Sequence, residues 1–192
     1  MCVLPTAYLG PQSYYRALLQ TDEAEIEAWE SFPKRTYRNR CRIAGVNGVQ
    51  TLTIPVEKCD SKQWTKDVKI VYRQPWQQQH WMALRSAYEH TPYFEYLEDR
   101  FRPYYEREVK YLLDWNMMLM EEVLRIMDAA RQSKVRRPQL TDQWRGRTDE
   151  SVWSDKGEEP PYYQVFASRH GFENNLSIVD RLFNMGLEGL WI

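Results

Sequence analysis

Three arginines alternate along a short basic segment of the chain. They occupy every second position of the sequence YRNRCRI and are Arg38, Arg40 and Arg42. An extended strand would place all three on one face. Guanidinium groups bind phosphates and carboxylates in a bidentate fashion. The segment therefore predicts an anion site in which Arg35, Asn39 and Arg40 hold the charged group of a substrate.

The same alternation also fits a solvated face of a strand. The arginines would then pair with acids such as Glu25 and Glu27, and exposed ion pairs of this kind contribute only about 0 to 1 kcal/mol each. Cys41 would point the other way, into the core. That direction favours a buried, inert thiol over a reactive thiolate between two cations.

One histidine lies on a predicted helix where it could take part in catalysis. Pro75 opens this helix, and Trp76, His80 and Leu84 share one of its faces. A histidine can act as a general base when an acyl group is transferred to an amine or a hydroxyl. His80 is therefore the candidate catalytic residue and Trp76 a candidate substrate contact. A hydrogen-bonded structural histidine is the alternative on such an apolar face.

A strand-to-helix turn near the start of the chain offers a further ligand contact. Residues 2–9 are mostly apolar, and Gly10-Pro11 then leads into a helix predicted from Ser13 to about Gln20. Gln12 lies in this turn, whose backbone N–H groups could face negative charge. We expect the turn, the basic segment and the start of the histidine helix to meet at one pocket for an anionic ligand.

The remaining pattern is typical of one α/β domain over residues 1–192, with helices packed on a central sheet. The sheet includes a β-hairpin over about 37–56, because two extended runs flank Asn47-Gly48, which predicts a type I′ turn. The other predicted elements are a strand at 68–72, a helix that Thr91-Pro92 starts and Pro103 kinks or restarts, a long amphipathic helix over 109–127, a polar loop over about 133–161 partly pinned by Trp144 and Trp153, and a helix over 177–184 closed by Gly186.

Composition argues against several classes of partner. The formal net charge is -1, so no global basic field attracts nucleic acid. No apolar run approaches the roughly 20 residues that span a bilayer, which predicts no membrane insertion. The first residues, MCVLPTAYLGP, lack the pattern of a signal peptide. A cytoplasmic protein is the simplest interpretation.

The cysteines and histidines predict neither a metal nor a disulfide. Cys2, Cys41 and Cys59 form no close pair, and the three histidines lack the spacing of metal ligands. Glycine-rich phosphate loops and the G-x-S-x-G elbow of serine hydrolases are absent from the sequence. We therefore expect a protein that needs no metal and no cofactor.

Four segments, in order along the chain, resemble the WbqC-like protein family. They are AYLGPQSYYRALL from Ala7, KRTYRNRCRIAGVNGVQTLTIPV from Lys34, WQQQHWMALRSAYEHTPYFEYLEDRF from Trp76 and YYQVFASRHGFENNLSIVDRLFNMG from Tyr162. The resemblance implies an α/β fold and a place in bacterial O-antigen and surface-polysaccharide biosynthesis. It also implies a glycine or aminoacyl transferase acting on a sugar or a sugar nucleotide.

Combined with the residues above, this resemblance suggests that Arg35, Asn39 and Arg40 hold an anionic group while His80 acts as the base. The main alternative is a non-catalytic module of the same pathway that binds a nucleotide-sugar or a partner enzyme. A third interpretation is a nucleotidyl-transfer-like enzyme, in which the first strand, turn and helix hold a phosphate.

Overall fold

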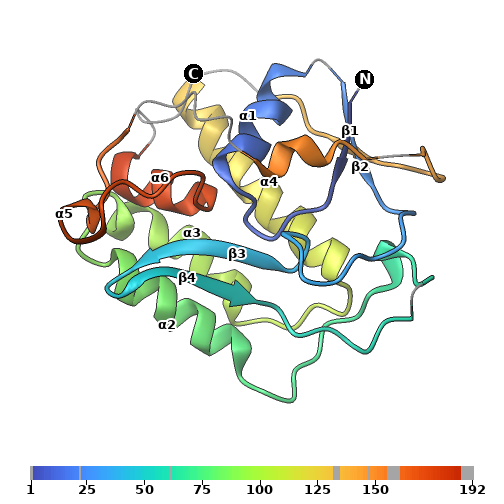
Figure 1. Cartoon of the computed structure of the whole chain (residues 1–192), viewed down its shortest axis with the longest axis horizontal. Coiled ribbons are helices and arrows are strands. Elements are labelled where there is room, and N and C mark those ends of the chain that lie inside the picture. The colour runs from blue at the N-terminus through green and yellow to red at the C-terminus, as the bar shows by residue number, and fades with distance from the viewer. Residues whose placement is uncertain are drawn as a thin grey trace.

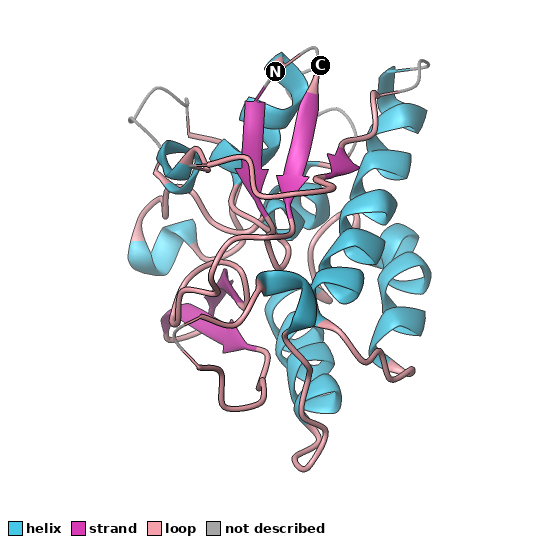
Figure 2. Ribbon diagram, turned by 90° about the vertical axis from the view of Figure 1, so that its right-hand side faces the viewer, coloured by secondary structure: helices cyan, strands magenta, loops and turns pink. Residues whose placement is uncertain are grey.

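The β-strands form two separate sheets (Figure 1). This computed structural model describes residues 2–21, 23–60, 62–131, 135–146, 148–154 and 161–186. One sheet has three parallel strands in the order β1-β2-β5, which are β1 (Cys2–Pro5), β2 (Ala24–Glu27) and β5 (Gln139–Leu140). Strands β3 (Arg40–Gly45) and β4 (Gly48–Thr53) pair antiparallel as a hairpin. The mixed α/β class is confirmed, with the hairpin as a sheet of its own below the parallel strands (Figure 2).

The hairpin is confirmed, but its turn is not of the predicted type I′. Gly45 pairs with Gly48, so the two residues between the paired strands are Val46 and Asn47. A type I′ turn needs positive φ at both central positions, and neither residue has it. Gly48 follows them with φ of 100°. A turn with negative φ that is followed by a left-handed glycine is typical of a G1 bulge.

Six α-helices lie in the described part of the chain, and Figure 1 shows them around the hairpin. They are α1 (Gln12–Gln20), α2 (Trp76–Tyr88), α3 (Phe94–Tyr105), α4 (Leu112–Arg131), α5 (Ala167–His170) and α6 (Ile178–Met185). The long helix α4 is as expected. Ser177 caps α6 by accepting a hydrogen bond from the N–H of Val179, and Gly186 ends that helix with φ of 60°.

Two local predictions are wrong. Residues 68–72 form no strand, because only isolated bridges involve Lys69 and Ile70. Thr91 does not cap α3. Its hydroxyl donates to the carbonyl of Tyr88 at the end of α2, at 2.7 Å, and α3 begins at Phe94. The ring of Pro103 is accommodated inside α3, which continues to Tyr105.

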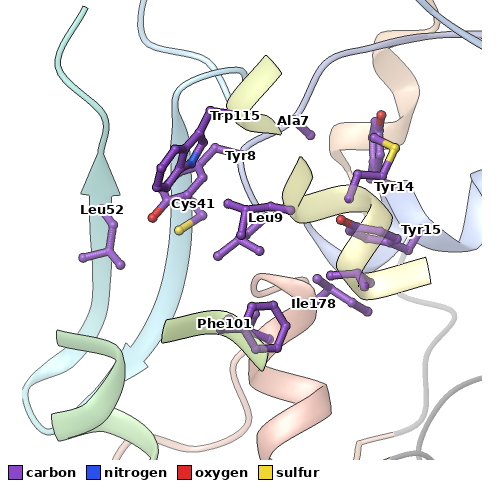
Figure 3. Packing of buried hydrophobic residues seen from close by; sticks show 14 of the residues in the cluster. Ala7, Tyr8, Leu9, Tyr14, Tyr15, Cys41, Leu52, Phe101, Trp115 and Ile178 are labelled. Carbon is purple, nitrogen blue, oxygen red and sulfur yellow. The ribbon is translucent and has the colours of Figure 1, made fainter. Parts of the chain in front are cut away.

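Large aromatic side chains pack among aliphatic ones in the core (Figure 3). Trp115 of α4 is fully buried, and its ring packs edge-on against Trp76 of α2 and Tyr105 of α3, with centroids 5.2 and 5.7 Å apart. Tyr8 and Cys41 lie beside Trp115 in Figure 3. Each large ring removes on the order of 150 to 250 Å² from water. This packing fixes α2 against the hairpin and the first strand-to-helix turn.

The predicted polar loop over 133–161 is partly pinned. Its residues 133–134, 147 and 155–160 lie outside the described residues. The described part contains β5 and a short 3-10 helix, Glu150–Trp153. The Trp153 ring stacks against Tyr14 of α1 and Tyr37, with centroids 5.6 and 5.3 Å apart, whereas Trp144 is exposed. Trp153 therefore anchors the segment, and Trp144 does not.

The first turn and the start of α6 are joined by the backbone. The N–H of Gln12 donates to the carbonyl of Leu176, and the N–H of Ile178 donates to the carbonyl of Gly10, at 3.1 and 3.0 Å. The hydroxyl of Ser177 also donates to the carbonyl of Leu9 at 2.7 Å. Segments more than 160 residues apart in the sequence thus form one unit.

Candidate functional site

A basic pocket of about 270 Å³ lies beside the start of the hairpin. Nine residues line it: Phe32, Lys34, Arg35, Asn39, Arg40, Val56, Glu57, Lys58 and Cys59. Four of these side chains are cations and one is a carboxylate. The Glu57 carboxylate lies 3.7 Å from the ammonium of Lys69, which is outside the pocket, so Lys69 partly compensates its charge. The lining therefore carries an excess of positive charge.

The local backbone brings the predicted anion-binding residues together at this pocket. Arg35 has a positive φ of 62°, which turns the chain just before β3. The side-chain amide of Asn39 donates to the carbonyl of Ile54, while the N–H of Ile54 donates to the carbonyl of Asn39, at 2.9 and 2.8 Å. These bonds fix Asn39 at the end of the hairpin, next to Arg40. Arg35, Asn39 and Arg40, which the sequence predicted for an anion site, thus all line this pocket.

Two polar atoms of the pocket residues have no hydrogen-bond partner within the described part of the chain. They are Oδ1 of Asn39 and Nε of Arg40, and both atoms are buried. Asn39 as a whole is only 7% exposed. A buried polar group without a partner costs roughly 1 to 3 kcal/mol. A bound anion could accept from Nε of Arg40, whereas Oδ1 of Asn39 is an acceptor and would need a donor such as a water or a hydroxyl. The free Arg40 donor and the four cations make the pocket the best candidate for an anion site.

Arg38 does not join this pocket, contrary to the alternating pattern. It precedes β3, is fully buried, and donates to both carboxylate oxygens of Glu30 at 2.5 and 2.7 Å. Glu150 adds a further contact at 3.1 Å. The strand begins only at Arg40, so the period of two does not reach Arg38. Arg38 is a buried structural cation.

The alternative pairing of the arginines with Glu25 and Glu27 is also wrong. Glu25 pairs with Arg145 at 3.1 Å. Glu27 is fully buried in β2 and accepts hydrogen bonds from the hydroxyl of Thr141 and the N–H of Trp29, at 2.8 and 2.7 Å. Both acids thereby tie β2 to the segment around β5 and do not neutralise the basic pocket.

His80 and Trp76 lie in the core and do not line the basic pocket. Nδ1 of His80 is 3.0 Å from the hydroxyl of Tyr8, which is itself 2.8 Å from the hydroxyl of Tyr105. Burial lowers the pKa of His80 to about 4, so the imidazole is neutral at pH 7. The Trp76 ring packs edge-on against His80 at 5.1 Å. This environment resembles that of a structural histidine.

Gln12 belongs to a second group of polar side chains, around the buried carboxylate of Asp180 (α6). Tyr88 and Tyr162 donate their hydroxyls to this carboxylate at 2.8 and 2.5 Å, and the amide of Gln164 donates to it at 3.2 Å. Gln12 donates its amide to the hydroxyl of Tyr162. Burial raises the pKa of Asp180 to about 6, although the three donors act to lower it.

The first turn, the basic segment and the start of α2 therefore lie together, as predicted, but their predicted site residues do not line one pocket. Tyr8 links the first turn to the basic segment, since its N–H donates to the carbonyl of Tyr37 at 2.9 Å, and it links the turn to α2 through His80. The basic pocket, however, contains neither Gln12 nor His80. Sequence reasoning missed Lys34, Lys58 and Cys59, although the basic residues flanking the hairpin are a visible signal.

The model of the WbqC-like protein family matches residues 6–149. The chain belongs to this family. The uncharacterized protein Rv1507c of Mycobacterium tuberculosis is 23% identical over 221 residues, which cover 98% of this chain and 94% of the relative. No solved structure matches the chain.

The match to the WbqC-like model includes every residue of the basic pocket, together with Gln12, Trp76 and His80. Asp180 and its partners Tyr162 and Gln164 lie beyond the matched range. The family assignment therefore rests on the part of the chain that builds the basic pocket. Most of the polar group around Asp180 lies outside the part of the chain that the family model covers.

The cysteines of this WbqC-like protein differ in their surroundings. Cys41 is fully buried, as predicted, and burial raises the pKa of its thiol far above the usual range. Cys59 lines the basic pocket, and burial raises its pKa too, although Lys34 acts to lower it. Neither thiol is set up as a thiolate nucleophile.

The described residues contain neither a cluster of metal ligands nor a helix that could span a membrane. No three side chains among His, Cys, Asp and Glu gather there as ligands for a metal ion. None of the described helices combines the length and the apolar character needed to cross a membrane.

Proposed function

We propose that this WbqC-like protein binds a phosphate-bearing small molecule of the sugar-nucleotide class in the basic pocket. The observation that supports this is the positive charge of the pocket: it has four cationic side chains, and one of them, Arg40, has an Nε–H donor without a partner in the described part of the chain. Guanidinium groups suit phosphate oxygens. A pocket of about 270 Å³ is at the small end for ligand sites, so it would hold the charged part of the molecule.

We further propose that the bound molecule is the acceptor for a glycyl or other aminoacyl group. This step follows from the family resemblance, which points to modification of sugars in surface-polysaccharide assembly. The acyl group would pass to an amine or hydroxyl of the sugar, and the leaving group of the donor would take the proton released. His80 remains the predicted base for this transfer. For His80 to reach a substrate, the packing around Tyr8 would have to change.

The second candidate is a non-catalytic module that binds the same class of ligand. The burial of His80, and its contact with Tyr8 instead of the pocket, favour this function. In that case the protein would present a sugar nucleotide to a partner enzyme in the cytoplasm. The basic pocket would then bind the sugar nucleotide without taking part in a reaction.

Calorimetry with UDP-, GDP- and CDP-sugars tests the binding proposal. Arg40→Ala removes a charge-assisted hydrogen bond worth roughly 1.5 to 3 kcal/mol, so we expect binding to weaken by about tenfold or more. Arg42→Ala is the matched control, because Arg42 lies two residues further along β3 and does not line the pocket. Equal affinity in the wild type and in Arg40→Ala would contradict the proposal, as would equal losses in both variants.

Mass spectrometry of the best-binding sugar nucleotide, incubated with the protein and a glycyl thioester, separates the two functions. A glycylated sugar nucleotide that is absent without protein would support the transferase. An unchanged nucleotide that nevertheless binds tightly would favour the binding module.

A further inference from the structure

A larger groove of about 810 Å³ lies at the opposite end of the hairpin. Residues 45–50 at the hairpin tip form one wall, and α2 forms the other with Gln79, Met82, Ala83, Ser86 and Ala87. Strand β3 runs from Arg40, in the basic pocket, to Gly45, in the groove. At about 3.3 Å per residue, these two positions are roughly 17 Å apart. The groove is therefore separate from the basic pocket.

The lining of the groove contains no ionisable side chain. This is unusual in a chain of which 28% of the residues are charged. A bound anion or cation would find no opposite charge there, and transferring an unpaired charge from water is costly. The lining therefore favours an electrically neutral ligand.

Four side chains of the groove can both donate and accept hydrogen bonds. Asn47 and Gln50 come from the hairpin, and Gln79 and Ser86 come from α2. All four are exposed, and in the described part of the chain their side chains make no hydrogen bond to the protein. Amides and hydroxyls match the hydroxyl groups of a ligand, which are donors and acceptors at once.

Apolar side chains lie between these polar groups. Met82 is 53% exposed and Val46 is 46% exposed, and Ala83 and Val49 also line the groove. Met is flexible enough to adapt to an irregular surface. The mixture suits a ligand with C–H faces and a rim of hydroxyls.

The hairpin wall is held in place from its other side. Nε2 of His170, at the end of α5, lies 2.8 Å from the carbonyl of Val46. The opposite wall is a regular helix that is anchored in the core by Trp76, Leu84 and Tyr88. Both walls are thus preformed, which lowers the ordering cost of binding.

We infer that this groove is a binding site for a neutral carbohydrate of one or more sugar units. The inference rests on the groove and would stand even if the basic pocket failed its own test. An extended peptide beside β4 is the competing occupant, and the experiment below distinguishes the two.

The test is a two-dimensional ¹H–¹⁵N NMR titration of the full chain. The probes are maltose, cellobiose, lactose and N,N′-diacetylchitobiose at tens of millimolar, and N-acetyl-trialanine amide serves as the peptide. We expect at least one of the sugars to shift the amide signals of residues 45–50 and 79–87, with no such shift from the peptide.

Two matched variants of α2 place the sugar in the groove. Gln79→Ala removes one lining amide, and losing a hydrogen bond worth about 0.5 to 1.5 kcal/mol should raise the dissociation constant roughly two- to tenfold. Gln78→Ala changes the neighbouring exposed glutamine, which does not line the groove, and should leave the constant unchanged. The inference is overturned if none of the sugars shifts these signals, if the peptide shifts them, or if both variants bind the sugar with equal affinity.

Discussion

Replacing Asp180 with asparagine should change how the stability of the protein depends on pH. The carboxylate is fully buried among Tyr88, Tyr162 and Gln164, and Arg181 lies over the ring of Tyr162, with its guanidinium carbon 4.8 Å from the ring centroid. Burial raises the pKa of Asp180 from 3.8 to about 6. The folded state therefore holds this proton more tightly than the unfolded state does.

The direction of the effect follows from that difference. The contribution of Asp180 to stability is largest below pH 3.8, falls as the pH rises from 3.8 to about 6, and is constant above that. At about 1.4 kcal/mol per pH unit, the loss over this window is about 3 kcal/mol. Asparagine cannot ionise, so Asp180→Asn escapes this loss. Its amide replaces one acceptor oxygen, which costs about 0.5 to 1.5 kcal/mol at every pH.

We therefore expect Asp180→Asn to be less stable than the wild type by about 1 kcal/mol near pH 3.5 and more stable by about 2 kcal/mol above pH 7. Urea unfolding of both proteins at several pH values measures the difference. Asp114→Asn, at an exposed position of α4, controls for the loss of a surface carboxylate. A difference that stays constant across the window, or that grows more negative as the pH rises, would refute the reasoning.

Three further predictions concern the hairpin turn, the buried ion pair and metals. Gly48→Val should lower stability by about 1 kcal/mol or more, because φ is 100° there and valine is strained at positive φ. No atom lies within 4 Å of the added Cβ, so a loss would come from the backbone and not from a clash, and an unchanged melting temperature would contradict this argument. Arg38→Met should cost about 3 to 5 kcal/mol by leaving Glu30 buried without its cation; urea unfolding should show partial recovery in the double variant with Glu30→Gln, and no recovery would argue against the pairing. Protein purified without a metal-binding tag should contain no stoichiometric zinc or iron in elemental analysis, since its His and Cys residues lack ligand spacing.

Local signals in the sequence were enough for the hairpin, the long helix and the last helix. Asn47-Gly48 located the turn within one residue, because a glycine with positive φ is needed there in either turn type. The boundaries of α6 follow from Ser177 and Gly186. Strand β2 was missed, since its sequence AEIE alternates acids with apolar residues and reads as a charged segment. Strand β5 is too short to carry a pattern.

Long-range contacts decided the rest. Arg38 and Arg40 look equivalent in the sequence. In the structure, Arg38 forms a buried ion pair with Glu30, whereas Arg40 lines the basic pocket. The surroundings of Asp180 depend on Tyr88, which lies 92 positions earlier in the chain. No local pattern announces such a partner. The basic pocket was predictable in part because its central residues, Arg35 to Arg40, are neighbours in the sequence.

The backbone joint between Gly10–Gln12 and Leu176–Ile178 bears on how the chain folds during synthesis. A nascent chain lacks the second half of this joint until residue 178 has left the ribosome. Until then the first turn keeps unpaired backbone groups, and the apolar face of α1 lacks its cover from α6. Contacts of such long sequence separation form slowly, and unfinished chains expose apolar surface that promotes aggregation. The first turn is therefore completed only after residue 178 has emerged, and nascent chains should expose this surface to chaperones until α6 docks.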